Sequence, residues 1–424
     1  MRKGNRLLIL LFLLVFFGGI GVGFIIGKHI KENKKENNDV VEPVKEPVDI
    51  SGVNNFDIKM LKLENKKKNM IYSPLSIKYA LNLVRYGADG KTKEELDSVL
   101  GTKEITKYDN IKDHLSLANS VFIKTSFKDF VLSSYLEDVK NNLNTEIMYD
   151  DFKNAKNVND WISNKTFDML KDVVTDEQIT NEDLRMLLIN ALAIDMEWVR
   201  PFDEANIRGQ EFTKEDGSKV EVTMMHGKFD NYDDDFKYYK DDNVSIISKD
   251  LKEYDGKQFE LIAILPEESL EDYINNLKDN DLDDLFGKLT GVDSNSDVNL
   301  AIPKFEYEYS MDDFKDNLKA IGLVDMFDEK TANFSKMASK ELYVSDGIHK
   351  AKIEFGEKGV KAAAVTVIMM FEKSSIEPQK KTINITFDKP FMYVIRDKES
   401  KEIWFMGTVY EPIDAYSANF GEDE

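Results

Sequence analysis

The 424-residue sequence contains no cysteine and only four histidines. Without cysteine, the chain can form no disulfide, no thiol nucleophile and no thiolate metal site. The histidines are scattered, and none of them forms the i,i+4 pair that places two metal ligands on one helix face. They are His29, His114, His226 and His349. We therefore expect neither a metal ion nor another cofactor.

Basic residues are too few to balance the acidic ones. The chain has 57 Lys and Arg against 79 Asp and Glu, and its net charge is −22. A surface this acidic repels a phosphate backbone, so the composition argues against nucleic acid as a partner. We interpret the run Asp233–Asp235 as solvated surface charge, because acidic clusters in such a chain usually face water.

The motifs of the common enzyme classes are also absent. The sequence has no Gly-x-Ser-x-Gly, no P-loop, no Gly-x-Gly-x-x-Gly and no His-Glu-x-x-His. Asp293, Asn295 and Asp297 resemble the start of a calcium loop, but Val298 and Lys304 replace its required Gly and Glu. A hydrolase is therefore the weakest hypothesis.

A long uncharged run stands near the N-terminus, from Leu7 to Gly27. Its 21 residues would extend about 31 Å as a helix, which spans a bilayer. We expect residues 1–27 to be a membrane anchor. A cleaved signal peptide is the alternative, although its apolar part usually has about 7–15 residues. Basic residues flank both ends, so charge leaves the orientation open. Residues 28–50 are polar and are predicted to form a disordered linker.

The remaining residues, 51–424, mix helix and strand patterns without a regular repeat. Ser73 followed by Pro74 is typical of a helix start, which predicts a buried helix over Ile77–Val84. Short, largely apolar runs predict core strands. These runs are Leu187–Ile194, Phe259–Leu265, Val298–Ile302 and Ile403–Val409.

One apolar segment is unusual in its surroundings. Ala362–Phe371 has ten uncharged residues, and periodicity alone would place it in the core. The sequence leading into it, Phe355–Thr366, closely resembles the hinge of the reactive-centre loop of serpins, where Glu-x-Gly precedes an alanine run and Thr. Other serpin-like motifs follow the family order between about residues 54 and 412. They include Ser73–Ser76, Asn190–Ala191, Trp198, Pro303–Phe305, Ile348–Lys350, Pro390–Phe391 and Phe405–Gly407.

The resemblance implies a mixed α/β serpin fold, a single domain of three β-sheets and eight or nine helices. It also implies an exposed reactive-centre loop, here at about residues 357–380. In inhibitory serpins a serine protease attacks this loop and forms an acyl-enzyme. The cleaved loop then inserts into the central sheet, called sheet A, and traps the protease. The resemblance thus implies a monomeric protease inhibitor that acts outside the cytoplasm and is not an enzyme.

The hinge has the composition that insertion requires. Residues of an inserting strand alternate between two faces, and Val360, Ala362, Ala364 and Thr366 would share the inward face without burying a charge. Lys361 would remain on the solvent face. The hinge set is Glu357, Gly359, Val360, Ala362, Ala363, Ala364 and Thr366. Noninhibitory serpins typically carry bulky, charged or proline residues here, so a noninhibitory binding or scaffold protein is the alternative.

The family spacing also predicts the bond that the protease cuts. The residue before that bond usually lies sixteen positions after the hinge Glu, which here gives Lys373 and the reactive bond Lys373–Ser374. Lys suits the acidic specificity pocket of trypsin-like proteases. Met370 and Phe371 would suit chymotrypsin-like or elastase-like proteases if the cut lies nearby.

Two further groups of residues take roles from the resemblance alone. A polar cluster beneath the opening point of sheet A, called the shutter, is expected at Ser73, Ser76, Asn190 and His349. Trp198 matches the tryptophan of the breach, where the loop first enters the sheet. None of these residues is expected to be catalytic.

Overall fold

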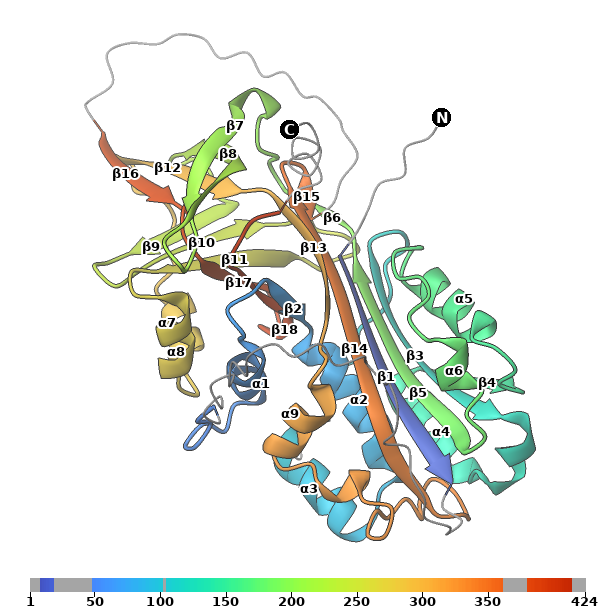
Figure 1. Ribbon diagram of the computed structural model, residues 1–424. Coiled ribbons are helices and arrows are strands. Elements are labelled where there is room, and N and C mark those ends of the chain that lie inside the picture. Colours follow the sequence, from blue (N-terminus) through green and yellow to red (C-terminus); the bar gives the residue numbers. More distant parts are fainter. Residues whose placement is uncertain (1–7, 19–47, 102–103, 361–379, 414–424) are drawn as a thin grey trace, which may run out of the picture.

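The computed structural model describes residues 8–18, 48–101, 104–360 and 380–413. Over these residues the chain forms three β-sheets, nine α-helices and three short 3₁₀ helices (Figure 1). The mixed α/β fold with three sheets, predicted from the resemblance, is confirmed.

The helices of the described residues fall between Phe56 and Phe327. They are α1 (Phe56–Glu64), α2 (Pro74–Gly87), α3 (Gly90–Leu100), η1 (Thr125–Phe130), α4 (Ser133–Leu143), α5 (Lys156–Lys165), α6 (Asp176–Ile179), η2 (Glu204–Asn206), α7 (Leu270–Asn276), α8 (Asp281–Phe286), α9 (Phe314–Ala320) and η3 (Asp325–Phe327).

The strands of the described residues form three sheets, which we name A, B and C. Sheet A is β4 (Thr145–Asp150), β3 (Leu115–Lys124), β5 (Leu184–Ile194), β1 (Leu8–Gly18), β14 (Leu342–Gly356), β15 (Gly359–Val360) and β6 (Met196–Glu197), with β13 (Phe305–Ser310) also paired to β14. Sheet B is β2 (Met70–Tyr72), β18 (Ile403–Val409), β17 (Phe391–Asp397), β11 (Phe259–Pro266), β10 (Val244–Asp250) and β9 (Phe236–Lys240). Sheet C is β16 (Lys381–Thr386), β12 (Ser296–Pro303), β8 (Lys219–Phe229) and β7 (Ile207–Thr213). The four predicted core strands correspond to β5, β11, β12 and β18.

Helix α2 begins as its sequence predicts. The Ser73 side chain caps it by accepting a hydrogen bond from the Ser76 backbone N–H over 2.9 Å, and Pro74 occupies the first turn, where its missing N–H costs nothing. The helix packs against β5, β1 and β18. It therefore lies directly beneath the middle of sheet A.

Strand β5 is apolar along nearly its whole length because both of its faces are covered. Met186, Leu188 and Leu192 belong to the main core, which includes α2. Leu187 and Ile189 belong to a second core on the other face, which includes residues of α5. This two-sided burial explains the nearly continuous hydrophobic run in the sequence.

Residues Leu8–Gly18 differ from the sequence prediction. The sequence predicts a membrane-spanning helix over Leu7–Gly27, whereas Leu8–Gly18 form β1, which pairs with β5 on one edge and β14 on the other (Figure 1). An uncharged segment can be accommodated in a sheet covered on both faces, where its backbone groups pair with both neighbours. Residues 1–7 and 19–27 lie outside the described residues. In the described part of the chain, no helix is long and apolar enough to cross a membrane.

Candidate functional site at the hinge of sheet A

The hinge is a tight turn between β14 and β15. Val360 pairs with Phe355 of β14 on one side and with Met196 of β6 on the other, and its side chain is fully buried. A Cβ atom on Gly359 would lie only 2.3 Å from the Met196 carbonyl oxygen. Glycine is therefore required at 359 so that the two backbones can approach this closely.

Glu357, the hinge carboxylate, forms an ion pair. Its Oε2 lies 2.8 Å from Lys304 Nζ, and both side chains are partly buried. Burial alone would raise the pKa of Glu357, but the hydrogen bond and charge of Lys304 outweigh it and hold that pKa below its ordinary value. At neutral pH the pair fastens the hinge turn to the start of β13.

Trp198 contacts the hinge through three groups. Its indole Nε1 donates to the Gly356 carbonyl oxygen over 2.9 Å, and its backbone N–H donates to the Lys358 carbonyl oxygen over 3.0 Å. Its ring packs edge-on against Phe355, with the centroids 5.7 Å apart. The structure thus places Trp198 at the hinge, where the resemblance puts the breach.

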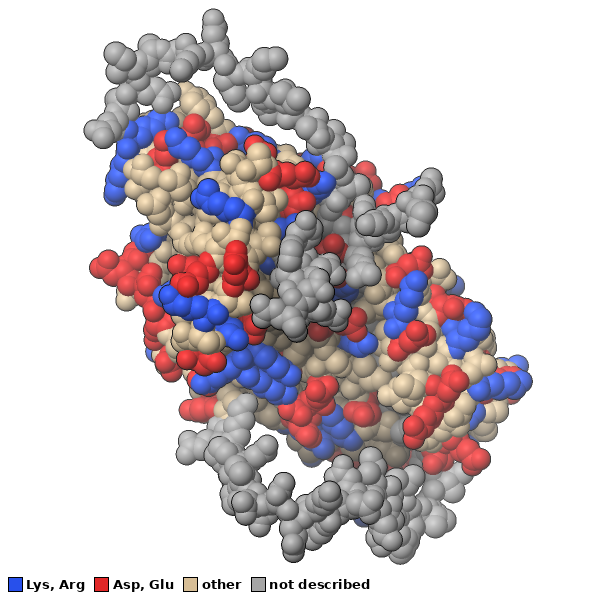
Figure 2. All heavy atoms as spheres, turned by 45° about the horizontal axis from the view of Figure 1, so that its top comes forward, with Lys and Arg blue, Asp and Glu red and all other residues tan. Residues whose placement is uncertain are grey.

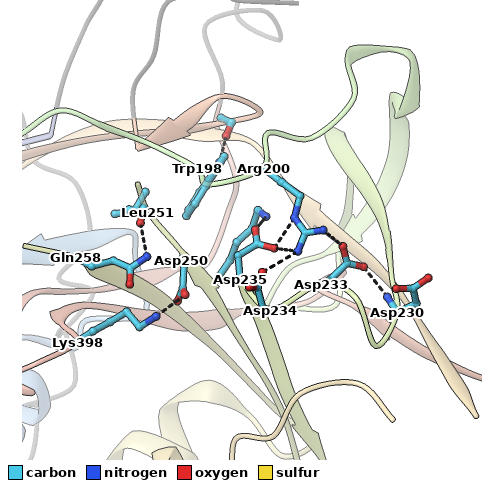
Figure 3. Close-up of polar contacts among 12 residues, drawn as sticks. Trp198, Arg200, Asp230, Asp233, Asp234, Asp235, Asp250, Leu251, Gln258 and Lys398 are labelled. Atoms are coloured by element: carbon cyan, nitrogen blue, oxygen red, sulfur yellow. Dashed lines mark hydrogen bonds and ion pairs between the residues drawn. The ribbon is translucent and has the colours of Figure 1, made fainter. Parts of the chain in front are cut away.

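A charged cluster stands beside the breach, and Figure 3 shows Arg200 reaching the carboxylates of a single acidic run. Arg200 pairs with Asp233 and donates from Nε to Asp235 over 2.7 Å. The side chain of Asp234 is 99% exposed, whereas that of Asp235 is only 2% exposed. The prediction that Asp233–Asp235 are surface charge is therefore wrong for Asp235, which is buried between the partly exposed Arg200 and the buried Lys249.

Lys249, in β10, is the buried cation of this cluster. Its Nζ lies 3.1 Å from Asp235 Oδ2, and its side chain is 3% exposed. The same Nζ lies 5.8, 5.5 and 5.2 Å from the ring centroids of Trp198, Phe202 and Phe229. Burial lowers the pKa of Lys249, although Asp235 opposes this shift. No motif in the sequence predicts that Lys249 lies at the breach.

The predicted shutter residues do come together on α2, β5 and β14. Ser76 Oγ donates to Asn190 Oδ1, and Asn190 Nδ2 donates to Asn119 Oδ1 over 2.9 Å. His349 Nε2 accepts from the Ser73 backbone N–H over 3.3 Å. Asn119, in β3, is a member that the sequence analysis missed.

Asn190 and His349 are not neighbours in this sheet. Phe12 of β1 is the register partner of both residues. One strand therefore separates β5 from β14 at this level, and adjacent strands lie about 4.8 Å apart. Each of the two residues is bonded instead to a serine at the start of α2, His349 to the N-cap Ser73 and Asn190 to Ser76 in the first turn.

Ion pairs on the surface are of a different kind. Lys and Arg side chains are interspersed with Asp and Glu on the face shown in Figure 2. Between β13 and β14, Lys350 pairs with Glu308 and Lys352 with Glu306, each over 2.6 Å. These four side chains are 15–45% exposed, and ion pairs that water reaches usually contribute only about 0–1 kcal/mol.

The predicted loop residues after Val360 lie outside the described residues. This applies to Ala362, Ala363, Ala364 and Thr366 of the hinge, to the proposed reactive bond Lys373–Ser374, and to the alternative sites Met370 and Phe371. Within the described residues, Glu357, Gly359, Val360, Trp198 and the shutter form a line along sheet A.

The fold and this line of residues agree with the comparisons. The family model described as "Serpin (serine protease inhibitor)" matches residues 52–412. This chain therefore belongs to the serpin family.

Several curated proteins resemble it over most of their length. Neuroserpin of Mus musculus is 29% identical over 369 residues, which cover 81% of this chain and 86% of that protein. A "Serine protease inhibitor" of Cyanea capillata is 29% identical over 371 residues, covering 82% and 93% of the two chains. An uncharacterized serpin-like protein of Methanosarcina mazei is 28% identical, with 81% and 82% covered.

Solved structures show the same fold. Tengpin, a thermophilic serpin in its native state, superposes with a TM-score of 0.68 at 26% identity, covering 90% of this chain and 97% of that one. A complex of thyroxine-binding globulin with thyroxine gives a TM-score of 0.67 at 24% identity, with 86% and 99% covered. The second likeness concerns the fold alone.

Proposed function

We propose that this chain inhibits serine proteases as a suicide substrate. The protease serine attacks the Lys373 carbonyl carbon, and the Ser374 amine leaves with a proton. The loop after Val360, freed by the cut, then enters sheet A as a new strand and carries the acylated protease with it. The trapped acyl-enzyme is the inhibited product.

The observation that carries this proposal is the position of β15. It pairs with β14 on one edge and with β6 on the other, antiparallel to both. A strand that continued from Val360 would therefore run along β14 in the column between β5 and β14, which β1 occupies in the uncut chain. The buried, uncharged side chain of Val360 fits such an entry, since a charge there would lose its hydration.

A trypsin-like protease is the proposed target. The support is the family spacing from Glu357 to Lys373, together with the need of an acidic pocket for a cation. Chymotrypsin-like or elastase-like proteases would be the targets if Met370 or Phe371 precedes the cut bond instead.

The test is to incubate the full chain with a panel of serine proteases. A complex that survives denaturant, together with a released C-terminal fragment that begins at Ser374, would support the proposal. Cleavage by every protease without any complex would favour the noninhibitory alternative. A fragment beginning at Phe371 or Glu372 would move the reactive bond.

We also propose that the protein acts outside the cytoplasm, held at a membrane by its N-terminal segment. The support is the uncharged run Leu7–Gly27 followed by the polar residues 28–50. Recovery of the full chain in the membrane fraction, with its loop open to protease added to intact cells, would support this location. A shorter form found only in the medium would show that the segment is cleaved.

A further inference from the structure

Strand β1 occupies a specific position in sheet A, the column between β5 and β14. It runs antiparallel to both strands, from Leu8 beside Ile194 to Gly18 beside Leu342. The other edge of β14 is paired with β13, and the other edge of β5 is paired with β3. We call this column the central position of sheet A.

β15 lies in the same column as β1. Both strands pair with β14 on the edge that β13 leaves free, and both run antiparallel to it. Val360 is opposite Phe355, and Ile9 is opposite Lys352. β1 therefore begins almost directly below the point where the hinge strand stops (Figure 1).

An inserting loop and β1 would pair with the same residues of β14. A strand that continued from Val360 in the register of β15 would bring position 363 opposite Lys352, where Ile9 lies. It would bring position 366 opposite His349, where Phe12 lies. The N-terminal segment and the inserting loop would thus need the same backbone partners, strand for strand and in the same direction.

The two segments are also chemically alike. Leu8–Gly18 and Ala362–Phe371 are both uncharged over their whole length. Either could supply backbone hydrogen bonds to β5 and β14 without bringing a charge into a sheet that is covered on both faces. Two strands cannot share one column, so one must leave before the other enters.

We propose that residues 8–18 are an internal ligand of the central position of sheet A, which blocks loop insertion while they are bound. While β1 is in place, a cut loop cannot insert, the acyl-enzyme is hydrolysed, and the chain behaves as a substrate. Unless it is locked in place, the segment exchanges in and out of the column, and each release lets the wild type act as an inhibitor. This control rests on the proposed function, because loop insertion is the step that it governs.

The segment cannot be in a bilayer and in sheet A at once. A spanning helix needs about 20 residues, so an anchor would have to include Leu8–Gly18. Membrane insertion would therefore empty the central position. The apolar run that suggests an anchor is thus also the run that blocks the sheet.

The experiment uses the natural absence of cysteine. Lys350 lies between Leu11 of β1 and Ser310 of β13, paired with both. In the full-length Leu11→Cys/Lys350→Cys chain, with its loop intact, mild oxidation should form a disulfide. Lys350→Cys/Ser310→Cys is the positive control, because those two strands are also adjacent. Leu11→Cys/Ser310→Cys is the negative control, since two strand spacings exceed the roughly 7 Å limit for bridging Cα atoms.

The Leu11→Cys/Lys350→Cys chain then tests whether β1 blocks loop insertion. The oxidised Leu11→Cys/Lys350→Cys protein should be cut by trypsin and give little covalent complex. The reduced and alkylated protein should give at least about tenfold more complex per cut, as expected when at least about 1.4 kcal/mol is removed from the barrier to insertion. Oxidising the Lys350→Cys/Ser310→Cys control should not change its yield of complex.

The outcomes separate the inference from the proposed function. If only the positive control forms a disulfide, β1 is not in sheet A and the inference is wrong. If the test disulfide forms and complex yield is the same in both forms, occupancy does not block insertion and the inference is again wrong. If neither the wild type nor the reduced protein traps any protease, the proposed function fails, and with it the regulatory role of β1, although the disulfide still reports where β1 lies.

Discussion

The indole Nε1 of Trp198 lies 2.9 Å from the carbonyl oxygen of Gly356, and this hydrogen bond joins the breach to the hinge. Trp198→Phe keeps an aromatic ring, although a smaller one, and removes the donor. A hydrogen bond contributes about 1 kcal/mol, so amide hydrogen exchange at Gly359 and Val360 should accelerate about fivefold. Trp161→Phe is the control, because that indole donates to Glu146 on the far side of sheet A. Equal exchange rates at Gly359 and Val360 in the two variants would show that the Trp198–Gly356 hydrogen bond does not hold the hinge in place.

The acidic run offers a matched pair of variants for the buried ion pair. Asp235→Asn should lower the free energy of unfolding by about 3–5 kcal/mol, because it leaves Lys249 buried without a countercharge. Asp234→Asn should change it little, since that side chain is almost fully exposed although it faces the same arginine. Urea unfolding of the uncleaved proteins measures both values. Similar losses of unfolding free energy in the two variants would show that the buried Asp235 stabilises the fold no more than the exposed Asp234.

Acid should weaken the fold through the shutter. Burial lowers the pKa of His349 to about 3, whereas an unfolded histidine titrates near 6.5. Between these values the unfolded chain binds a proton that the folded chain does not, so stability falls as the pH falls from about 6.5 toward 3. The slope from this group approaches about 1.4 kcal/mol per pH unit. His349→Gln should show a shallower slope in urea unfolding at several pH values, and an unchanged slope would remove His349 as the cause.

Much of the fold follows from local sequence. Ser73 and Pro74 predict the start of α2, and the apolar runs predict β5, β11, β12 and β18 because buried strands need little else. The hinge and shutter were predicted only from the serpin-like motifs. No local rule joins Ser73 to His349, which lie 276 positions apart.

Two features could not be predicted from the sequence, for different reasons. The apolarity of Leu8–Gly18 fits a bilayer and a covered sheet equally well. Only the fold shows that the segment pairs with β5 on one edge and β14 on the other. Asp235 looks like surface charge because its partners, Arg200 and Lys249, come from other strands and loops. The single hint is that Lys249 and Asp250 directly follow the Val-Ser-Ile-Ile-Ser run of β10.

The proposed reactive bond can be tested by removing one cation. Lys373→Ala should lower the rate of complex formation with trypsin by at least about thirtyfold, because an acidic pocket left without its partner costs roughly 2–5 kcal/mol. Lys380→Ala is the control. It removes a lysine at the far end of the predicted loop and should inhibit like the wild type. Edman sequencing of the released fragment locates the cut. Full inhibition by Lys373→Ala would place the reactive bond elsewhere.

Strand entry beyond Val360 is the central claim. Val360 is already buried in the hinge before any cut, whereas Ala364 is expected to become buried only when the loop inserts. Ala364→Arg therefore adds the cost of burying a cation, several kcal/mol unless the charge escapes, to the insertion step. Each 1.4 kcal/mol added to the insertion barrier slows insertion about tenfold, while hydrolysis of the acyl-enzyme continues. Lys361→Glu, expected on the solvent face, is the control.

The most direct measurement is the ratio of covalent complex to cleaved inhibitor when the full-length chain meets a trypsin-like protease. The account predicts complex with the wild type and with Lys361→Glu. It predicts cleavage at the same bond and release of active protease with Ala364→Arg. An Ala364→Arg chain that forms as much complex as the wild type would contradict loop insertion as the mechanism.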